Sequence, residues 1–331
     1  MKYLLAFLSV LQLSAFAQNK AGLTNQPDTS FSNYSAYLNA KKKYPEIRLV
    51  KDSVLPSIQD ERNITYRTVG NTSLQIDVFR PKKIKGKRPA IIIIHGGGWR
   101  SGNRTQHYPL AERLAEKGFV CFTPAYRLST EALYPAAVLD LKEAIRWVRA
   151  KAGKYHVDTT QIAVLGFSAG GQLATLLGTT GNNPIFTDPQ SQLKKYSTKV
   201  NAIVDIDGTL AFIHPESGEG DDSKSTSAAT YWFGYNKTEK PDLWRQAAAL
   251  TYAGPQTPPT LFINSAVDRM HAGRTDYIND LKQGNVYTEV RAFPDTPHTF
   301  CLFEPWFTPT VNYITGFLDK IFPHNKNDRS E

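Results

Sequence analysis

Residues 162–178 read IAVLGFSAGGQLATLLG, and this stretch decides the fold. An apolar run typical of a buried strand ends at the motif GFSAG, residues 166–170, and a helical pattern begins directly after it. A G-x-S-x-G motif between a strand and a helix predicts a nucleophile elbow, a tight turn that exposes a serine hydroxyl. A serine that only caps the helix is the alternative. The preceding strand favours the elbow, so Ser168 is the predicted nucleophile.

The stretch AIIIIHGGGW at residues 90–99 joins a stiff, apolar strand to a run of glycines. A serine that attacks a carbonyl creates an oxyanion, and backbone N–H groups must already point at it. Glycines let a loop bring its N–H groups close to the substrate. We predict Gly97 and Gly98 as donors, together with Ala169 after the nucleophile, and His95 as a scaffold of the loop. A phosphate loop is excluded, because neither G-x-G-x-x-G nor G-x-x-x-x-G-K-[ST] occurs here.

From residue 88 onward, short apolar runs alternate with helical patterns. This alternation predicts an α/β fold with a mostly parallel sheet and helices on both faces. The predicted strands are 90–94, 119–125, 162–168, 202–208, 260–268 and 289–295, and the predicted helices are 107–118, 136–153, 169–178 and 309–322. Before them, residues 63–70 and 73–81 alternate apolar and polar side chains, as half-buried antiparallel strands do.

The N-terminus has one Lys, an apolar run and Ala15-Phe16-Ala17, which are typical of a cleavable secretory signal at residues 1–17. The run is too short to span a bilayer, and no later segment reaches transmembrane length. A secreted or periplasmic protein without a membrane span is therefore expected.

The rest of the chain is expected to form one catalytic domain with appendages. An N-terminal arm covers residues 18–60, the catalytic domain covers 61–323, and a polar tail covers 324–331. Residues 208–245 are long, polar and aromatic, and a loop of this length is either functional or disordered. Aromatic residues argue against disorder. We interpret the segment as an insertion over the carboxyl edge of the sheet, where such folds bind ligands.

The motifs HGGGW and GFSAGG, with the order of strands and helices, resemble the α/β-hydrolase superfamily over roughly residues 60–323. Within it, the chain resembles secreted bacterial esterases of the acetyl-esterase and feruloyl-esterase type. VDIDGTLAFIHPES, INSAVDRMHAGR and FPDTPHTFCLFEPWF resemble a subgroup placed among pectin-acting and other polysaccharide esterases. Ala125 stands where the wider group often has an aspartate, so only structural roles are expected for Tyr126 and Arg127. The resemblance implies ester hydrolysis with no cofactor.

The superfamily places its catalytic triad in the order Ser, acid, His. His298 is the predicted base, because it alone follows the last predicted strand in a Pro-rich loop and comes after both the serine and the acid. It would take the Ser168 proton and return it to the leaving alcohol. The competing histidines are His95, His107, His156, His214, His271 and His324.

The acid is predicted to be Asp268, at the end of the run TLFINSAVD. A carboxylate between a strand and a loop is well placed to orient the histidine and stabilise its cation. Asp205 and Asp207 end an earlier strand and remain rivals. Asp295 lies only three residues before His298, too close in the chain. A loop cap or an ion-pair partner is the alternative role for Asp268.

Aromatic side chains are frequent on the segments predicted to surround the serine. Aromatic faces stack on sugar rings, although core packing is the commoner fate of any single ring. We expect two or three rings to line the cleft, and the candidates for substrate contact are Trp99, Tyr231, Trp232 and Trp306.

The formal net charge is +9, with the basic residues scattered along the chain. Solvated surface charge explains this balance, and an acidic polysaccharide is the partner class it leaves open. No nucleic-acid motif is present. The run HPESGEGDD at residues 214–222 matches neither an EF-hand loop nor a zincin motif, so no metal is expected. Cys121 and Cys301 are interpreted as two buried thiols, with one disulfide as the alternative.

The expected function is an exported serine esterase that hydrolyses acetyl, methyl or feruloyl esters on plant cell-wall polysaccharide such as pectin or hemicellulose, through an acyl-enzyme. A general short-chain carboxylesterase or a lipase is the main alternative. A serine peptidase is less favoured, because oligopeptidases carry a large extra domain. A non-catalytic binding protein is also less favoured, because such proteins usually lose the serine, the histidine or the oxyanion glycines.

Overall fold

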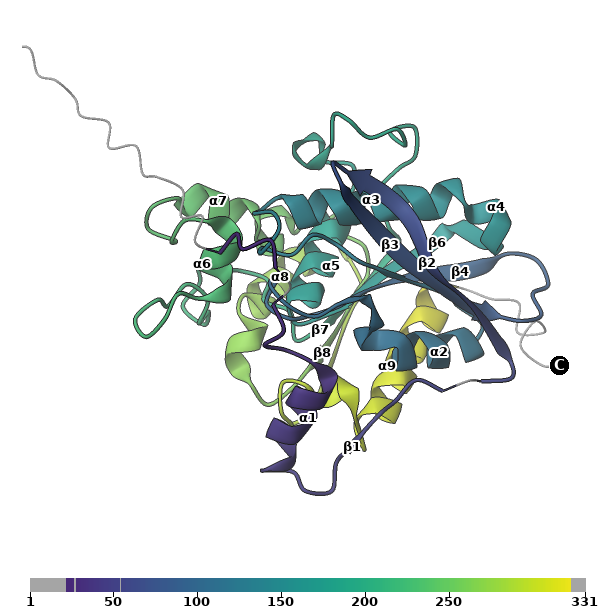
Figure 1. Cartoon of the computed structure of the whole chain (residues 1–331), viewed down its shortest axis with the longest axis horizontal. Coiled ribbons are helices and arrows are strands. Elements are labelled where there is room, and N and C mark those ends of the chain that lie inside the picture. Colours follow the sequence, from purple (N-terminus) through teal and green to yellow (C-terminus); the bar gives the residue numbers. More distant parts are fainter. Residues whose placement is uncertain (1–21, 27, 54, 323–331) are drawn as a thin grey trace, which may run out of the picture.

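The computed structural model describes residues 22–322 except residues 27 and 54, so the predicted signal peptide and polar tail lie outside the described residues. An eight-stranded sheet forms its centre, in the order β2-β3-β5-β4-β6-β7-β8-β9 (Figure 1). β3 pairs antiparallel with β2 and β5, and the other neighbours pair parallel. The strands are β2 (Ile58–Val69), β3 (Thr72–Pro81), β4 (Arg88–Ile94), β5 (Val120–Pro124), β6 (Val157–Phe167), β7 (Ala202–Ile206), β8 (Thr260–Asn264) and β9 (Thr288–Ala292).

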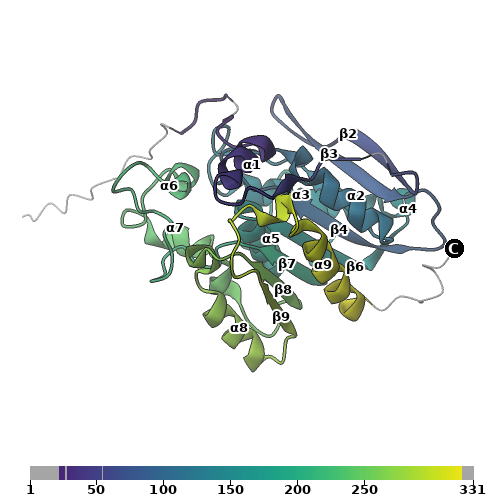
Figure 2. The ribbon, with the colours of Figure 1, turned by 90° about the horizontal axis from the view of Figure 1, so that it is seen from below.

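Helices cover both faces of this sheet, as the alternating pattern predicts. The longer helices pack on two apolar clusters, one on each face of the sheet (Figures 1 and 2). On one face lie α2 (Tyr108–Glu116) and α9 (Phe307–Ile321), and on the other lie α3 (Ala136–Ala150), α5 (Ala169–Thr180) and α8 (Arg274–Gln283). The predicted α/β architecture, a mostly parallel sheet with helices on both faces, is confirmed.

The run of four isoleucines in β4 is buried on both sides. Ile91 and Ile93 pack with α2 and α9, whereas Ile92 and Ile94 pack with α3 and α5. Alternate side chains of a strand point to opposite faces, so a strand covered on both faces has no polar positions. This explains why the parallel strands have continuous apolar runs rather than an alternating pattern.

The helices that follow two neighbouring strands leave the sheet on opposite faces. α2 follows β4 and packs on one face, whereas α5 follows β6 and packs on the other. Ligand sites of open α/β sheets form at such a switch point, beyond the carboxyl ends of the strands. The loop at residues 95–102 leaves β4 and Ser168 leaves β6, so the topology brings the two predicted glycine-rich pieces together.

The N-terminal arm is more regular than its polar sequence indicates. It contains α1 (Asn33–Lys41) and β1 (Arg48–Leu49), and β1 pairs antiparallel with β10 (Phe303–Glu304). Ser32 caps α1 through a reciprocal bond with Ser35. Among the residues of α1 only Ala40 is buried, and without an apolar stripe the helix leaves little pattern to detect.

The predicted insertion at residues 208–245 folds over one end of the molecule, at the left of Figures 1 and 2, and contains α6 (Ala228–Phe233) and most of α7 (Pro241–Gln246). Four of its aromatic residues form a fully buried cluster: Phe212, Trp232, Phe233 and Trp244. These rings order the segment by packing together, as its aromatic content predicts.

The remaining elements are short connections: α4 (Ala152–Tyr155), η1 (Arg104–His107), η2 (Pro184–Phe186), η3 (Ala249–Tyr252), η4 (Asp268–His271) and η5 (Phe300–Leu302). Cys121 and Cys301 are both buried and unpaired, which confirms two buried thiols. Within the described residues, every helix is too short or too polar to cross a membrane.

Because β4 is buried on both faces, truncating one of its side chains should cost much stability. Ile92→Ala should lower the free energy of unfolding by about 2–5 kcal/mol, because the neighbouring strands and helices cannot close around the missing atoms. Urea denaturation followed by tryptophan fluorescence measures the change. Val290→Ala on the edge strand β9 is the matched control, since Val290 is 42% exposed, and it should change stability by less than about 0.5 kcal/mol. Equal losses in both variants would contradict this account of the core.

Candidate active site

Ser168 lies on a strained turn between β6 and α5. Its backbone has φ 57° and ψ −123°, and its N–H donates to the Ile206 carbonyl at 2.8 Å. The turn brings the strand and helix so close that a β-carbon on Gly166 would lie 1.9 Å from the Gly170 carbonyl oxygen. Only glycine fits there. The strand–turn–helix context of a nucleophile elbow is therefore present at GFSAG.

The side chain of His298 bridges this serine to a buried carboxylate. His298 Nε2 lies 2.9 Å from Ser168 Oγ, and His298 Nδ1 lies 2.9 Å from Asp207 Oδ2. The ring of Phe167 packs beside the imidazole, with ring centroids 4.8 Å apart. In this arrangement Nδ1–H donates to the carboxylate, which leaves Nε2 to accept the serine proton. The pattern is that of a Ser–His–Asp triad.

Asp207 is fully buried and completes this chain. Besides His298, it accepts the Ser265 N–H at 2.8 Å and the Nε2–H of His271 at 3.1 Å. Burial on its own raises the pKa of this carboxyl, but the hydrogen bonds from His271, His298 and Ser265 outweigh burial and lower the pKa below its ordinary value. Asp207 is therefore charged at neutral pH and stabilises a positive His298.

The prediction of Asp268 as the acid is wrong. Asp268 begins η4 with an exposed side chain, and within the described residues the carboxylate bound to His298 is that of Asp207. The carboxyl ends of β7 and β8 are neighbours, so both aspartates follow strands near the serine. Asp207 turns inward at φ 53°, whereas the loop after β8 directs His271, not Asp268, toward that carboxylate.

The other two acidic candidates have structural roles. Asp205 is buried beneath α5, where it accepts the Gly208 N–H at 2.6 Å and the Thr175 hydroxyl at 3.3 Å. Burial raises the pKa of Asp205 well above its usual value, so it is not a charged partner for a histidine. Asp295 is exposed and pairs with Lys43 at 3.4 Å.

The glycine loop after β4 lies directly against the serine. A β-carbon on Gly96 would lie 3.1 Å from Ser168 Cβ, and the Gly96 N–H is already bound to Gln106 Oε1 at 2.7 Å. Within the described residues, the N–H groups of Gly97, Gly98 and Ala169 donate to no protein acceptor. These three groups, the predicted oxyanion donors, are thus left available beside the nucleophile.

The loop is held in place by side chains beneath it. His95 is buried, its Nδ1–H donates to the Gly96 carbonyl at 2.9 Å, and its ring stacks on Tyr126 with centroids 4.4 Å apart. The Tyr126 hydroxyl donates to the His95 carbonyl at 2.9 Å. Burial lowers the pKa of His95 to about 4, so the ring is neutral. His95 and Tyr126 are scaffold residues of the loop, and Arg127 forms a structural ion pair with Asp140.

Two of the four predicted substrate-contact aromatics are buried, so that prediction is wrong for Trp99 and Trp232. Their rings stack on each other with centroids 4.9 Å apart, and they are 4% and 0% exposed. Trp99 also donates its indole N–H to Gln172 at 2.9 Å. Sequence cannot distinguish these rings from cleft residues, because packing and stacking on sugar require the same residue types.

The other two aromatics are partly exposed and contact the N-terminal arm. Tyr231 packs beneath the Arg100 guanidinium, 4.5 Å from the ring centroid, and contacts Gly22. Trp306 packs edge-on against Tyr44 with centroids 5.4 Å apart. Their role in substrate contact stays a prediction.

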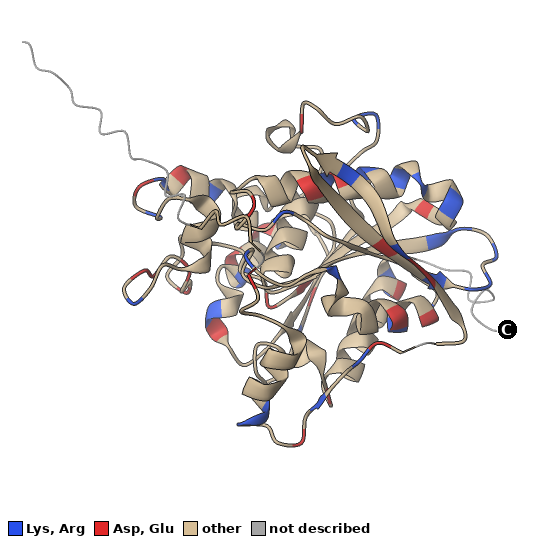
Figure 3. Cartoon of the chain, viewed as in Figure 1, with Lys and Arg blue, Asp and Glu red and all other residues tan. Residues whose placement is uncertain are grey.

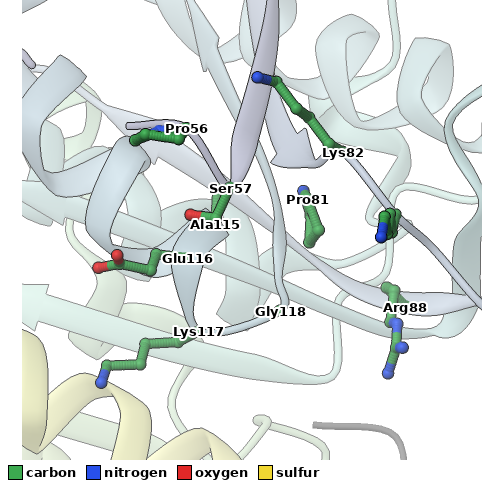
Figure 4. Close-up of a pocket in the computed structure, with 10 residues that line it drawn as sticks. Pro56, Ser57, Pro81, Lys82, Arg88, Ala115, Glu116, Lys117 and Gly118 are labelled. Carbon is green, nitrogen blue, oxygen red and sulfur yellow. The ribbon is translucent and has the colours of Figure 1, made fainter. Parts of the chain in front are cut away.

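A surface hollow of about 490 Å³ lies at the other end of the sheet (Figure 4). It is lined by residues around the start of β4 and the turn after α2, including Lys82, Arg88 and Lys117. β4 carries the glycine loop at its opposite end, so the hollow is separate from Ser168. Figure 3 shows basic residues spread over several elements, with a group between β3 and β4. No cluster of three or more metal-ligating residues occurs in the described part of the chain.

A family model and a curated relative match the sequence of this chain. The BD-FAE family model matches residues 76–273, a range that contains Ser168 and Asp207. Esterase LipC of Mycobacterium tuberculosis is 30% identical over 269 residues, which cover 74% of this chain and 62% of LipC. The chain thus spans less than two thirds of that relative.

Two solved structures resemble the chain in fold. A truncated carbohydrate esterase from gut microbiota has a TM-score of 0.67 and 22% identity, covering 81% of this chain and 99% of that one. Esterase 2 of Thermogutta terrifontis has a TM-score of 0.66 and 23% identity, covering 82% of this chain and 97% of that one.

The geometry predicts which aspartate activates the serine. Asp207→Asn should slow labelling of Ser168 by a fluorophosphonate about 10³- to 10⁴-fold, because the amide no longer fixes the histidine tautomer or stabilises its cation. Asp268→Asn is the matched control and should label at the rate of the unmodified protein. Labelling rates are measured by intact-mass spectrometry over time. Slow labelling of Asp268→Asn with normal labelling of Asp207→Asn would reassign the acid.

Proposed function

The chain belongs to the BD-FAE family, and we propose that it is a serine carboxylesterase that works through an acyl-enzyme. The observation that carries the proposal is the continuous hydrogen-bond chain from Ser168 through His298 to Asp207. The glycine loop with its available N–H groups lies beside the serine, and this combination suits attack on an ester carbonyl.

Acylation begins when Ser168 Oγ bonds to the carbonyl carbon and passes its proton to His298 Nε2. The buried charge of Asp207 stabilises the imidazolium that forms. The carbonyl oxygen becomes an oxyanion and accepts hydrogen bonds from the backbone N–H groups of Gly97, Gly98 and Ala169. When the tetrahedral intermediate collapses, the ester C–O bond breaks and His298 returns its proton to the leaving alcohol.

Deacylation repeats these steps with water as the nucleophile. Water fills the space of the departed alcohol, gives a proton to His298 and bonds to the acyl carbon. Collapse of the second intermediate releases the carboxylic acid and restores the Ser168 hydroxyl. All the protein groups used are within the described residues, and no step requires a metal or a cofactor.

The proposed substrate is an ester on plant cell-wall polysaccharide, with an acetyl, methyl or feruloyl group. Three observations support this class. The solved structure from gut microbiota is a carbohydrate esterase. The N-terminal sequence has the features of an export signal, and the net charge of +9 suits an acidic polymer such as pectin. Export to the periplasm or the exterior is part of the proposal.

A general short-chain carboxylesterase is the second candidate. LipC is named an esterase without a polymer in its name. The burial of Trp99 and Trp232 also removes two of the aromatic faces expected for sugar stacking. The two candidates share the same chemistry and differ only in what binds beside the reacting ester.

The experiment compares the purified mature protein with its Ser168→Ala variant. Both are incubated with acetylated and methylated pectin, acetylxylan and feruloylated arabinoxylan, and acetate, methanol and ferulate are quantified. Nitrophenyl acetate serves as the small ester. Ser168→Ala should lose roughly 10⁵- to 10⁶-fold in kcat, because no other nucleophile of the triad remains.

Serine-dependent release of one product from a polymer is the expected result, and it identifies the bond cleaved. Turnover of nitrophenyl acetate without release from any polymer would leave the short-chain esterase and reject the polysaccharide substrate. Equal turnover by both proteins would reject the serine mechanism itself.

A further inference from the structure

The N-terminal arm runs along the candidate active site rather than away from it. Figures 1 and 2 show its described part starting beside α6 and reaching α1. At its beginning, the Gly22 carbonyl accepts a bond from the Arg100 guanidinium at 3.3 Å. The Asn25 N–H donates to the Thr130 carbonyl at 2.9 Å. The arm is thus bound to the catalytic domain well before β2 begins.

Asp28 connects the arm to the glycine loop. Its carboxylate lies 2.7 Å from Arg100 Nε, and its backbone forms a parallel bridge with Ser101. The side chains of Asp28 and Arg100 are only 17% and 22% exposed. Burial on its own raises the pKa of Asp28, but bonds from Ser30 and the charge of Arg100 lower it below its ordinary value. A half-buried, charged pair of this kind fixes a loop better than a surface pair.

Asn33, five residues further along the arm, connects to the glycine loop indirectly, through Gln106 of η1. Its side-chain amide donates to the Gln106 carbonyl at 2.9 Å, and Gln106 in turn accepts the Gly96 N–H through its own side chain. Gln106 is buried. The arm therefore supports the residue that precedes both predicted oxyanion glycines.

The end of the arm connects to the segment that follows His298. β1 pairs with β10, with Leu49 opposite Phe303, and the Val50 N–H donates to the Leu302 carbonyl at 3.1 Å. Tyr44 packs against Trp306. The arm thus contacts the chain on both sides of the triad, at the glycine loop and just beyond the base.

We propose that the N-terminal arm is a clamp that positions the oxyanion loop, with Asp28 acting through Arg100 as its central positioning residue. This inference rests on the proposed esterase function. The loop leaves the sheet after Ile94 and passes through Gly97, which has φ 118° and no room for a β-carbon, since Ser101 O would lie 2.2 Å away. A glycine backbone is flexible, so contacts from other segments are needed to keep the N–H groups of this loop pointing at the oxyanion.

The clamp predicts a loss in kcat that comes from geometry. Asp28→Ala and Arg100→Ala should each lower kcat for nitrophenyl acetate roughly 10- to 100-fold with little change in KM, because a small misplacement of transition-state donors has effects of this size. The double variant should be no worse than Arg100→Ala alone, because Asp28 acts through Arg100, which also binds the Gly22 carbonyl and packs on Tyr231. Asp28→Asn, which can still accept the Ser30 N–H, should lie between the wild type and Asp28→Ala.

Hydrogen–deuterium exchange supplies a measurement that does not depend on activity. Peptides covering residues 95–103 should exchange faster in Asp28→Ala than in the wild type. Asp60→Ala is the matched control. Asp60 also accepts from an arginine Nε, that of Arg62, but it lies in β2 of the central sheet, past the part of the arm that contacts the glycine loop. The control should leave kcat and the exchange of this loop unchanged.

Three results would overturn the clamp: wild-type kcat and exchange in Asp28→Ala, equal losses in Asp28→Ala and Asp60→Ala, or single losses that multiply in the double variant. If the proposed esterase function is wrong, the wild type and Ser168→Ala would not differ in turnover. Faster exchange at residues 95–103 in Asp28→Ala would still support the clamp in that case.

Discussion

The backbone of Ser168 is the constraint on which the site depends. A non-glycine residue at φ 57° is held in a conformation that costs on the order of 1–3 kcal/mol, so the surrounding structure must impose it. It does so by burying β6 between two neighbours, by binding the Ser168 N–H to β7, and by packing α5 so closely that Gly166 touches Gly170. The result is a serine whose side chain lies directly against the loop from β4.

The second constraint is the burial of a charged carboxylate. Asp207 is removed from water, yet three donors hold its charge, and two of them are histidines. In such a site the field of the carboxylate acts on His298 without screening by solvent. His271 thus has a defined place on the second oxygen of Asp207, opposite the base. From the sequence alone, His271 is only a rival base. The signal that could have found it is its place in the loop three residues after the predicted strand at residues 260–268.

The fold was predictable because burial leaves a clear pattern in the sequence. Strands covered on both faces show continuous apolar runs, and all six predicted parallel strands overlap those of the sheet. The predicted pair at residues 63–70 and 73–81 overlaps β2 and β3. α1 was not predicted, because a helix that buries only Ala40 carries no apolar stripe. The geometry around Ser168 and His298 agrees with their predicted places, since motif and chain order define these positions.

The acid and the substrate aromatics were harder to predict for a physical reason. β7 and β8 end side by side, so aspartates after either strand satisfy the same pattern, and only the inward turn of Asp207 separates them. Tryptophan is a residue type that binds sugars, but the rings of Trp99 and Trp232 stack on each other instead. The arm contributed no motif at all, because its contacts through Asp28 and Asn33 are single hydrogen bonds between segments far apart in the sequence.

A crystal structure of the protein after reaction with a fluorophosphonate tests the central claim most directly, because the adduct resembles the tetrahedral intermediate. We expect a covalent bond to Ser168 Oγ, with a phosphonyl oxygen within about 3 Å of the N–H groups of Gly97 or Gly98 and of Ala169. His298 should keep its hydrogen bond to Asp207. An adduct on another residue, a phosphonyl oxygen directed away from the glycine loop, or His298 bound to Asp268 would contradict the account.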